Sequence, residues 1–600
     1  MRREPPRAAV LLGENQWPSA PPVNPLAGLR LLRRCTLGTF CASLARSDWI
    51  SYTLLSETGS AASGDGNDDV EVPERRTAAV LAIVCLTTAL GLPATAQAAG
   101  PAGRSTGRCT PGAPGIGDPY YPNYGNGGYE VRKYDLDVTY DPATDVLDGV
   151  AGIKASATKS LCSFNLDLVG MTVRSIEVNG ARARWSRTEH ELTVIPKSPI
   201  KRGEFEVKVR YDGVPHEFVL QLPGFELRTG FMATPDGATV AGQPEVAAGW
   251  FPVNDHPLDK ARYSFDVTVP KRYEVAANGF LTGRETKRGW TTYKWDAREP
   301  MASYLATIDI GFWDVHKWRT DTGLPVYDAV DSAITGGLRS VIDSSLARQG
   351  EVLDVLGGAF GPYPFSTVGA IVDNQDDLFF ALETQTRPVY SKLFWLDADG
   401  NPVNGDSVVV HELAHQWFGD KIALARWQDI WLNEGFATYA EWLWAEHEGQ
   451  ATPQEMFRAT YDAIPADDPF WDVVIGDPTV EFLFDDPVYV RGAMTLQALR
   501  NEVGDDDFWR IVRRWAAQRD GHGTTSEFIA LAERISGQQL DKFFDVWLFT
   551  GEKPASPDAA ASASRAAAAS TDDKASDDKA SDFARQWLAN TSERLKRGRR

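Results

Sequence analysis

The most informative stretch of this chain is His411-Glu412-Leu413-Ala414-His415. Its two histidines stand four residues apart, so on a helix they share one face and both imidazoles can reach a single metal ion. Glu412 lies between them, where it can take a proton from a water at that ion. Glu434 follows after enough residues for one helix to end and a second to deliver a carboxylate. Two imidazoles, one carboxylate and an open fourth position are typical of a catalytic zinc site.

The pattern therefore predicts a zinc hydrolase in which His411, His415 and Glu434 hold the metal and Glu412 is the base. The alternative is a helix whose histidines are ordinary core residues. The chain has only 8 histidines, so a chance match to both histidines, the glutamate between them and a correctly spaced distal glutamate is improbable.

The flanking residues predict the two helices that this site needs. Asp406 or Ser407 can cap the first helix, the apolar residues 408–410 follow, and Gly419 stands where it would stop. A second helix is predicted over about residues 429–448, with Glu434 near its beginning. Its many tryptophans indicate core packing.

Composition bounds the class of protein. A chain of 600 residues predicts two or three domains, and 43% hydrophobic residues are ordinary for a globular protein. The net charge of −21 argues against nucleic acid and anionic membranes as partners. An acidic surface suits positively charged substrates such as free amino termini, or simply favours solubility. We expect a monomer, without stable membrane insertion of the mature chain.

The N-terminal part has the pattern of a secretory signal peptide over residues 71–98. Arg75-Arg76 precede an apolar run over residues 78–92, and Ala96-Gln97-Ala98 provides a cleavage signal. The run is too short to span a bilayer. Because a signal peptide stands at the start of a chain, residues 1–70 are interpreted as an over-extended start or a disordered leader, with Val70 or Val72 as candidates for the true initiator. The alternative is a cytoplasmic extension with a membrane anchor. The pattern predicts a secreted protein.

Cysteine usage agrees with export. Of 5 cysteines, only Cys109 and Cys162 fall after the predicted cleavage site. An even pair in an exported protein predicts one disulfide, which would tie the segment after the cleavage site to the first domain. The alternative is two free thiols.

The rest of the chain divides by its hydrophobic periodicity. Residues 99–128, rich in Gly, Pro and Tyr, predict an extended segment that leads into the first domain. Alternation of period two predicts an all-β sandwich over 129–325, and helical patterns predict a mainly α domain over 326–552. The Ala/Ser/Asp/Lys-rich residues 553–600 predict disorder, although 583–600 could form a short amphipathic helix with a basic end.

Three further stretches of sequence accompany the zinc motif. They are Gln243-Pro244-Glu245, Phe380-Ala381-Leu382-Glu383-Thr384-Gln385 and Tyr489-Val490-Arg491-Gly492-Ala493. Together with the zinc motif, they resemble the aminopeptidase N-like family of zinc metallopeptidases, the gluzincin aminopeptidases, over about residues 129–552. The chain looks closest to short, exported bacterial members that lack the C-terminal helical domain. The resemblance implies a thermolysin-like catalytic domain with one zinc ion per chain.

The resemblance also implies roles for four residues outside the zinc motif. Tyr489 would donate to the oxyanion, and Arg491 stands where the family has lysine. Glu383 would bind the substrate's ammonium group, although Thr384 replaces the family's asparagine. Glu245 would bind the same ammonium group, and Gln243 the backbone of the first substrate residue. The alternative for each is an ordinary core or loop position. The other histidines, His190 among them, are interpreted as surface or core residues.

We therefore expect an exported zinc-dependent aminopeptidase acting on peptides with free amino termini. The alternatives are a secreted zinc endopeptidase, or a catalytically silent peptidase-like binding protein. Because the family's capping domain is missing, we also expect a more open cleft.

Overall fold

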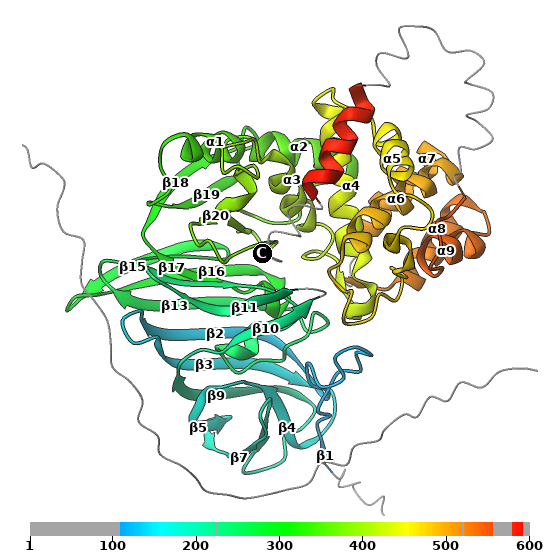
Figure 1. Cartoon of the computed structure of the whole chain (residues 1–600). Coiled ribbons are helices and arrows are strands. Elements are labelled where there is room, and N and C mark those ends of the chain that lie inside the picture. The colour runs from blue at the N-terminus through cyan, green and yellow to red at the C-terminus, as the bar shows by residue number, and fades with distance from the viewer. Residues whose placement is uncertain (1–108, 223–224, 519–520, 556–578, 592–600) are drawn as a thin grey trace, which may run out of the picture. The chain divides into compact units, whose positions relative to one another are not determined.

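The computed structural model describes residues 109–222, 225–518, 521–555 and 579–591 (Figure 1). The predicted over-extended start, the signal peptide and residues 99–108 lie outside the described residues. All described residues belong to the compact unit that begins at Pro101. Within them, none of the helices combines the length and the apolar character needed to cross a bilayer.

The first region is a β-sandwich. Its largest sheet has eight strands in the order β15-β16-β13-β2-β3-β9-β5-β6, and a four-stranded sheet, β1-β4-β8-β7, packs against it. The eight strands are β2 (Tyr129–Asp141), β3 (Val146–Ala157), β5 (Thr172–Val178), β6 (Ala181–Arg182), β9 (Gly203–Gly213), β13 (Ala261–Pro270), β15 (Phe280–Lys287) and β16 (Trp290–Met301). The four are β1 (Thr110–Pro111), β4 (Leu161–Asp167), β7 (Arg184–Arg187) and β8 (Glu191–Ile195).

The predicted alternation of these strands is confirmed by their burial. Tyr134, Leu136 and Val138 on β2 are at most 2% exposed, and they point to the core face of the sheet. Between the two sheets, Phe164 of β4 packs edge-on against Phe205 of β9, with ring centroids 5.4 Å apart. The sandwich is therefore held by aromatic packing between its two inner faces.

The predicted disulfide is present between Cys109 and Cys162, whose Cα atoms lie 5.1 Å apart. It ties the first described residue to β4, one of the strands of the smaller sandwich sheet. The prediction that a disulfide anchors the N-terminal segment to the first domain is confirmed.

Two five-stranded sheets follow the sandwich, in the orders β10-β11-β12-β17-β14 and β18-β19-β20-β22-β21. The first comprises β10 (Glu217–Leu222), β11 (Phe225–Thr234), β12 (Gly237–Ala241), β14 (Glu274–Ala277) and β17 (Ile308–Gly311). The second comprises β18 (Trp313–Arg319), β19 (Pro325–Asp331), β20 (Val368–Asp373), β21 (Ala381–Leu382) and β22 (Val389–Ser391). The second sheet thus spans the domain boundary predicted at residue 325.

A buried carboxyl group joins two strands of the first of these sheets. Asp309 on β17 accepts a hydrogen bond from the Val240 N–H at 2.7 Å. Thr307 Oγ1 lies 2.8 Å from Asp309 Oδ2 and 2.7 Å from the Val240 carbonyl. One hydroxyl hydrogen cannot serve both acceptors, so a protonated Asp309 that donates to Thr307 satisfies the network. Burial raises the pKa of Asp309 to about 8.

The second region is mainly helical, as predicted. Its helices are α1 (Gly336–Leu346), α2 (Gln349–Phe360), α3 (Asp406–His415), α4 (Trp431–His447), α5 (Pro453–Ala463), α6 (Asp486–Val503), α7 (Asp505–Ala516), α8 (Thr525–Ser536) and α9 (Asp541–Leu548). Two short strands, β23 (Ala423–Leu424) and β24 (His522–Gly523), pair in parallel. The start of α3 differs from the prediction, because Gly405 is the N-cap residue and the Ser407 hydroxyl bonds Glu441 instead.

The α4–α6 crossing is set by two glycines. A Cβ atom on Gly492 of α6 would lie 2.7 Å from the Cα of Gly435 on α4, so neither position has room for a side chain. This close approach places the first turn of α6 beside the turn of α4 that carries Glu434.

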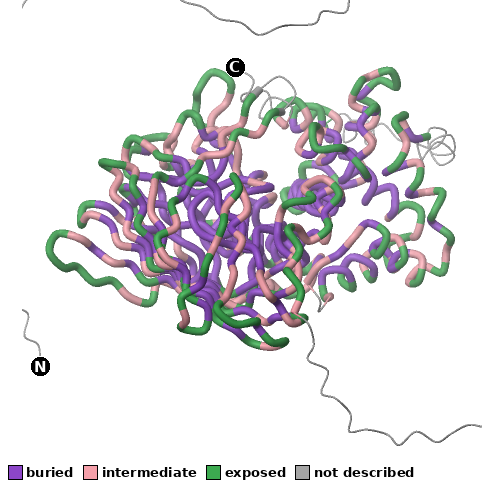
Figure 2. Tube along the Cα trace, turned by 90° about the horizontal axis from the view of Figure 1, so that it is seen from below, coloured by how far each residue is buried: buried purple, intermediate pink, exposed green. Residues whose placement is uncertain are grey.

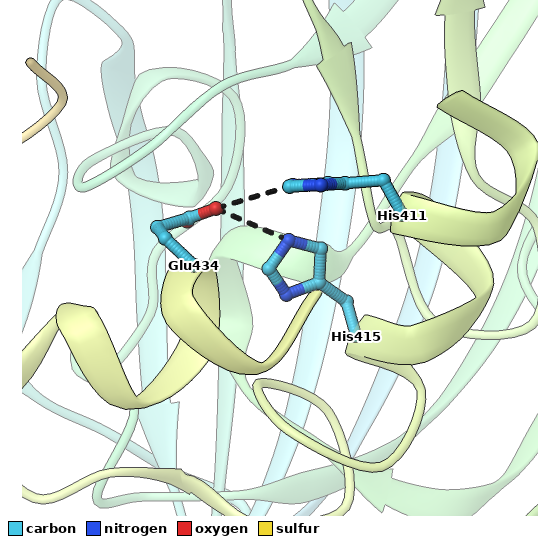
Figure 3. A group of neighbouring side chains, drawn as sticks. All are labelled: His411, His415 and Glu434. Atoms are coloured by element: carbon cyan, nitrogen blue, oxygen red, sulfur yellow. Dashed lines mark hydrogen bonds and ion pairs between the residues drawn. The ribbon is translucent and has the colours of Figure 1, made fainter. Parts of the chain in front are cut away.

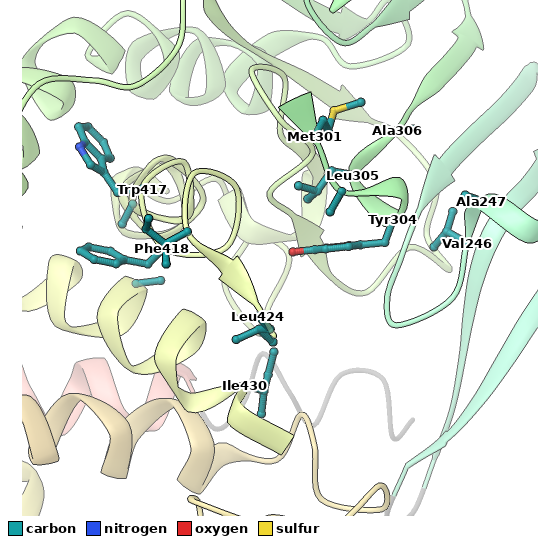
Figure 4. Close-up of a cluster of buried hydrophobic side chains, with 14 of the residues drawn as sticks. Val246, Ala247, Met301, Tyr304, Leu305, Ala306, Trp417, Phe418, Leu424 and Ile430 are labelled. Atoms are coloured by element: carbon teal, nitrogen blue, oxygen red, sulfur yellow. The ribbon is translucent and has the colours of Figure 1, made fainter. Parts of the chain in front are cut away.

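One large hydrophobic cluster of the described residues runs through both regions, and a smaller second cluster lies beside the five-stranded sheets. Figure 4 shows Tyr304 and Leu305 from the β region packed with Phe418, Leu424 and Ile430 from the helical region, and all of these are buried. Figure 2 shows that buried residues fill the interior while exposed residues follow the loops and outer faces. The sandwich and the helices therefore form one packed body around the residues described below.

The C-terminal tail departs from the predicted disorder over part of its length. Residues 579–591 form a helix in which Ala580, Ala584 and Trp587 are buried (Figure 1). The remaining tail residues, 556–578 and 592–600, lie outside the described residues.

Candidate metal centre

Helices α3 and α4 bring the three predicted ligands together. His411 and His415 lie one turn apart on α3, and Glu434 faces them from the first turn of α4 (Figure 3). Glu434 Oε2 lies 3.4 Å from His411 Nε2 and 3.3 Å from His415 Nε2. A tetrahedral zinc ion about 2.1 Å from each donor would hold the donors about 3.4 Å apart. The residues present therefore fit a zinc ion.

The other ring nitrogen of each histidine is engaged, which leaves Nε2 for the metal. His411 Nδ1 donates to Glu441 Oε1 at 2.9 Å, and His415 Nδ1 donates to the Phe418 carbonyl at 3.0 Å. Such partners fix the tautomer and the orientation of a ligating imidazole.

Glu441 is a functional residue that the sequence analysis missed. It lies seven residues after Glu434 on α4, so two helical turns bring both carboxylates to the same face. Its Oε2 accepts hydrogen bonds from Ser407 Oγ and from Trp587 Nε1. The seven-residue spacing from the predicted ligand was the signal that could have identified it.

Glu412 lies beside the ligands and lines the same cavity. The side chain is buried, and this burial raises the pKa of Glu412 to about 8, against the opposing effect of the two histidines. A divalent cation held by the neighbouring ligands would favour the ionised carboxylate that a general base requires.

The ring of Tyr489 stacks against the ring of His411, with centroids 6.0 Å apart, and Tyr489 also lines the cavity. It belongs to the first turn of α6, which the Gly435–Gly492 crossing brings against α4. Burial raises the pKa of Tyr489 well above its ordinary value of 10.0, so the phenol stays neutral and keeps a hydrogen to donate.

Glu383 places a further carboxylate at the metal centre. One oxygen of Glu383, one of Glu412 and one ring nitrogen of His415 all lie within 4.8 Å of one another. Tyr304, which the sequence analysis did not single out, donates its hydroxyl to Glu383 Oε1 at 2.8 Å. Thr384, in the place of the family's asparagine, instead donates to the Arg387 carbonyl and stabilises the loop.

The structure separates the two predicted residues of the β region. Gln243 lines the metal-centre cavity, and its buried Oε1 has no hydrogen-bond partner among the described residues. Glu245 is buried but is not among the cavity-lining residues, and its carboxylate hydrogen-bonds His190 Nε2. Burial alone would lower the pKa of His190, but Glu245 and Asp167 raise it to about 9. His190 is thus a cationic partner of Glu245 and not an ordinary surface residue.

The cavity around these residues has a volume of about 130 Å³. It is lined by Gln243, Phe379, Phe380, Ala381, Glu383, Phe394, Val408, His411, Glu412, His415, Glu434, Thr438, Glu441, Tyr489 and Thr591. Thr591 comes from the C-terminal helix, so the tail contributes to the wall of this cavity.

The fold and the site define the class of protein. Two histidines from one helix and a glutamate from the next, with a buried glutamate between the histidines, are the ligand set and base of a zinc metallopeptidase. The comparisons with known proteins identify the family. The model of the peptidase M1 N-terminal domain matches residues 130–305, and that of the peptidase family M1 domain matches residues 389–547. The chain belongs to the peptidase M1 family.

Curated relatives of the chain are aminopeptidases. It is 24% identical to Probable aminopeptidase 2 of Sulfurisphaera tokodaii over 437 residues, which are 70% of this chain and 53% of that protein. It is 25% identical to the leucyl aminopeptidase of Saccharolobus solfataricus, over 64% of this chain and 48% of that protein. The chain spans about half the length of these relatives.

Solved structures also resemble the chain. An M1 zinc metallopeptidase from Deinococcus radiodurans has a TM-score of 0.64 and 29% identity, and the match covers 74% of this chain and 99% of that one. A mutant of that protein bound to a Tyr-Ser-Ala substrate has the same TM-score and identity, over 72% of this chain and 97% of that one. The two-region architecture therefore has solved counterparts over nearly their full length.

Proposed function

We propose that this chain is an exported zinc aminopeptidase that removes N-terminal residues from peptides. The observation that carries the proposal is the position of Glu383, a buried carboxylate within 4.8 Å of Glu412 and His415 in the same cavity. A free amino terminus supplies the cation that such a carboxylate binds through charge-assisted hydrogen bonds. An endopeptidase has no use for a carboxylate there, because its substrate continues past the scissile bond on both sides.

Zinc supplies Lewis acidity at such a site, acting on the scissile carbonyl and on the attacking water. In the proposed reaction, Glu412 accepts a proton from that water and returns it to the leaving amine. Tyr489 donates its phenol hydrogen to the oxyanion that forms as the carbonyl becomes tetrahedral. His411, His415 and Glu434 would hold the metal.

Three residues are assigned to binding the amino-terminal end of the substrate. Glu383 binds the ammonium group, while Tyr304 fixes the orientation of its carboxylate. Gln243 offers its unpartnered amide oxygen to the first substrate residue. An amine-binding role for Glu245 stays a prediction, and it requires the carboxylate to be shared with His190.

Export is supported by the pattern of residues 71–98 and by the disulfide between Cys109 and Cys162. Disulfides of this kind persist in oxidising compartments and are rare in the cytosol. Sequencing the N-terminus of the protein recovered from the culture medium tests this part of the proposal. A start near residue 99 supports export, and retention of the whole protein in the cytosol contradicts it.

The activity is tested with amino-acid amides of chromogenic amines beside the same compounds with acetylated amino groups, each with and without chelator. Chelator-sensitive cleavage of only the free-amine set supports the proposal. Equal cleavage of both sets would indicate an endopeptidase, and bound zinc without turnover would indicate a silent binding protein. The Glu383→Gln variant should raise KM for the free-amine set, because the amide keeps the shape of the side chain and loses its charge.

A further inference from the structure

We propose that residues 579–591 form a lid over the chain's own substrate cavity, which a peptide must displace to extend beyond its first residue. The inference rests on the aminopeptidase function proposed above. This helix lies beyond the family match, which ends at residue 547. Figure 1 shows it in red against α4, the helix that carries Glu434 and Glu441.

One face of the helix is docked. Ala580, Ala584 and Trp587 follow one another at spacings of four and three, and they are 4%, 0% and 8% exposed. The Trp587 ring packs edge-on against Trp442 of α4, with centroids 5.9 Å apart. Its Nε1 donates to Glu441 Oε2 at 3.0 Å. The helix is therefore bonded to the residue that orients His411.

The end of the helix separates two hollows. Thr591 lines the metal-centre cavity, and Leu588, one turn earlier, lines a neighbouring hollow of about 640 Å³. The start of α6 makes the same division, because Tyr489 lines the first space and Val490 lines the second. The lid and α6 together thus form the partition between the metal centre and the larger hollow.

The sizes of the two spaces indicate why the partition must open. Sites that enclose a small-molecule ligand usually have about 300–1,000 Å³, whereas the metal-centre cavity has about 130 Å³. Withdrawal of the helix removes its part of the partition toward the 640 Å³ hollow, where the following residues of a peptide can lie. If a substrate binds only the open form, its apparent affinity is its intrinsic affinity multiplied by the fraction of molecules that are open.

The test compares two full-length variants with the same change of charge on opposite faces of this helix. Ala584→Arg puts a long cation on the docked face, and Gln586→Arg is the matched control on the exposed face. The substrates are a chromogenic amide of one residue and an octapeptide beginning with that residue. If the lid is open about one time in ten, A584R should raise the octapeptide-to-amide ratio of kcat/KM about tenfold. Q586R should leave that ratio at the wild-type value.

A second measurement reports on docking without turnover. A synthetic peptide of residues 576–594 should bind the A584R protein in a calorimeter, whereas the same peptide carrying Ala584→Arg should not. The unchanged peptide should also restore the low octapeptide-to-amide ratio of kcat/KM in the A584R protein. If both substrates are cleaved and A584R leaves the ratio of kcat/KM unchanged, the lid proposal is overturned. An absence of peptide binding would overturn it too. Failure of every form to cleave either substrate would instead overturn the proposed function, while peptide binding would still decide the docking.

Discussion

Replacing Glu441 with glutamine should weaken the metal site, although Glu441 is not itself a ligand. Its carboxylate serves three donors, because Oε1 accepts from His411 Nδ1 while Oε2 accepts from Ser407 and Trp587. A glutamine side chain has one oxygen and one NH2 group. Whichever way the amide is turned, its NH2 group faces the N–H of either His411 or Trp587.

The size of the effect follows from what the His411 ring loses. Removing the partner of a ligating histidine typically costs about 10- to 100-fold in metal affinity, which corresponds to about 1.4–2.7 kcal/mol. The loss should be largest when the amide turns its NH2 toward His411, because the ring then rotates away from Glu434. Apart from any effect on the ring, the variant also loses a negative charge close to a dication.

The assay is a titration of the metal-free protein with zinc against a competing chelator at neutral pH. Glu446→Gln is the matched control, since it makes the same change at the exposed end of the same helix. E441Q should bind zinc at least about tenfold more weakly than E446Q. Equal zinc affinity of the two variants would refute the orientation of His411 by Glu441.

Three further changes test other parts of the structure. Tyr489→Phe should lower kcat about 100- to 1,000-fold with little change in KM, because one oxyanion donor is removed. An equal loss of kcat for a substrate that needs no oxyanion donor would contradict this role. Gly492→Ala should destabilise the fold by about 1–3 kcal/mol by overpacking against Gly435, whereas Gly357→Ala, which meets nothing within 4 Å, should stabilise it by about 0.5–1 kcal/mol in denaturant titrations. Asp309 has an ordinary pKa of 3.8 when unfolded and a pKa of about 8 when buried, so its contribution to stability is complete below pH 4 and is lost as pH rises through 8. Asp309→Asn should therefore raise the melting temperature relative to the wild type at pH 9 more than at pH 5, and an equal shift at both would contradict a protonated Asp309.

The zinc ligands could be predicted from the sequence because their geometry is local. His411 and His415 face one way as soon as their segment is helical, and the periodicity of that segment was evident. The prediction of Glu434 as the third ligand needed only one further assumption, that the next helix packs against the first. The sandwich strands were predictable for the same reason, since alternate burial is a property of each strand by itself.

The residues that support the ligands could not be predicted in the same way. Tyr304 reaches Glu383 from a segment 79 residues earlier in the chain, and nothing in the local sequence of either residue indicates the contact. His190 has no paired spacing with other histidines, yet tertiary folding places it against Glu245. The start of α3 shows a related limit, because Ser407 has the side chain of a capping residue and instead bonds Glu441 on another helix.

The tail shows how a correct compositional argument can give an incomplete answer. A tract of Ala, Ser, Asp and Lys cannot bury a core of its own, so disorder is the expectation for such a segment in isolation. Residues 579–591 need no core of their own, because α4 provides the apolar surface and Glu441 the hydrogen-bond acceptor. Two small alanines and one tryptophan on one face of this helix are buried. A short helix that docks through one face, without a core of its own, can be released without unfolding the domain beneath it, which is the property that a lid over a substrate cavity requires.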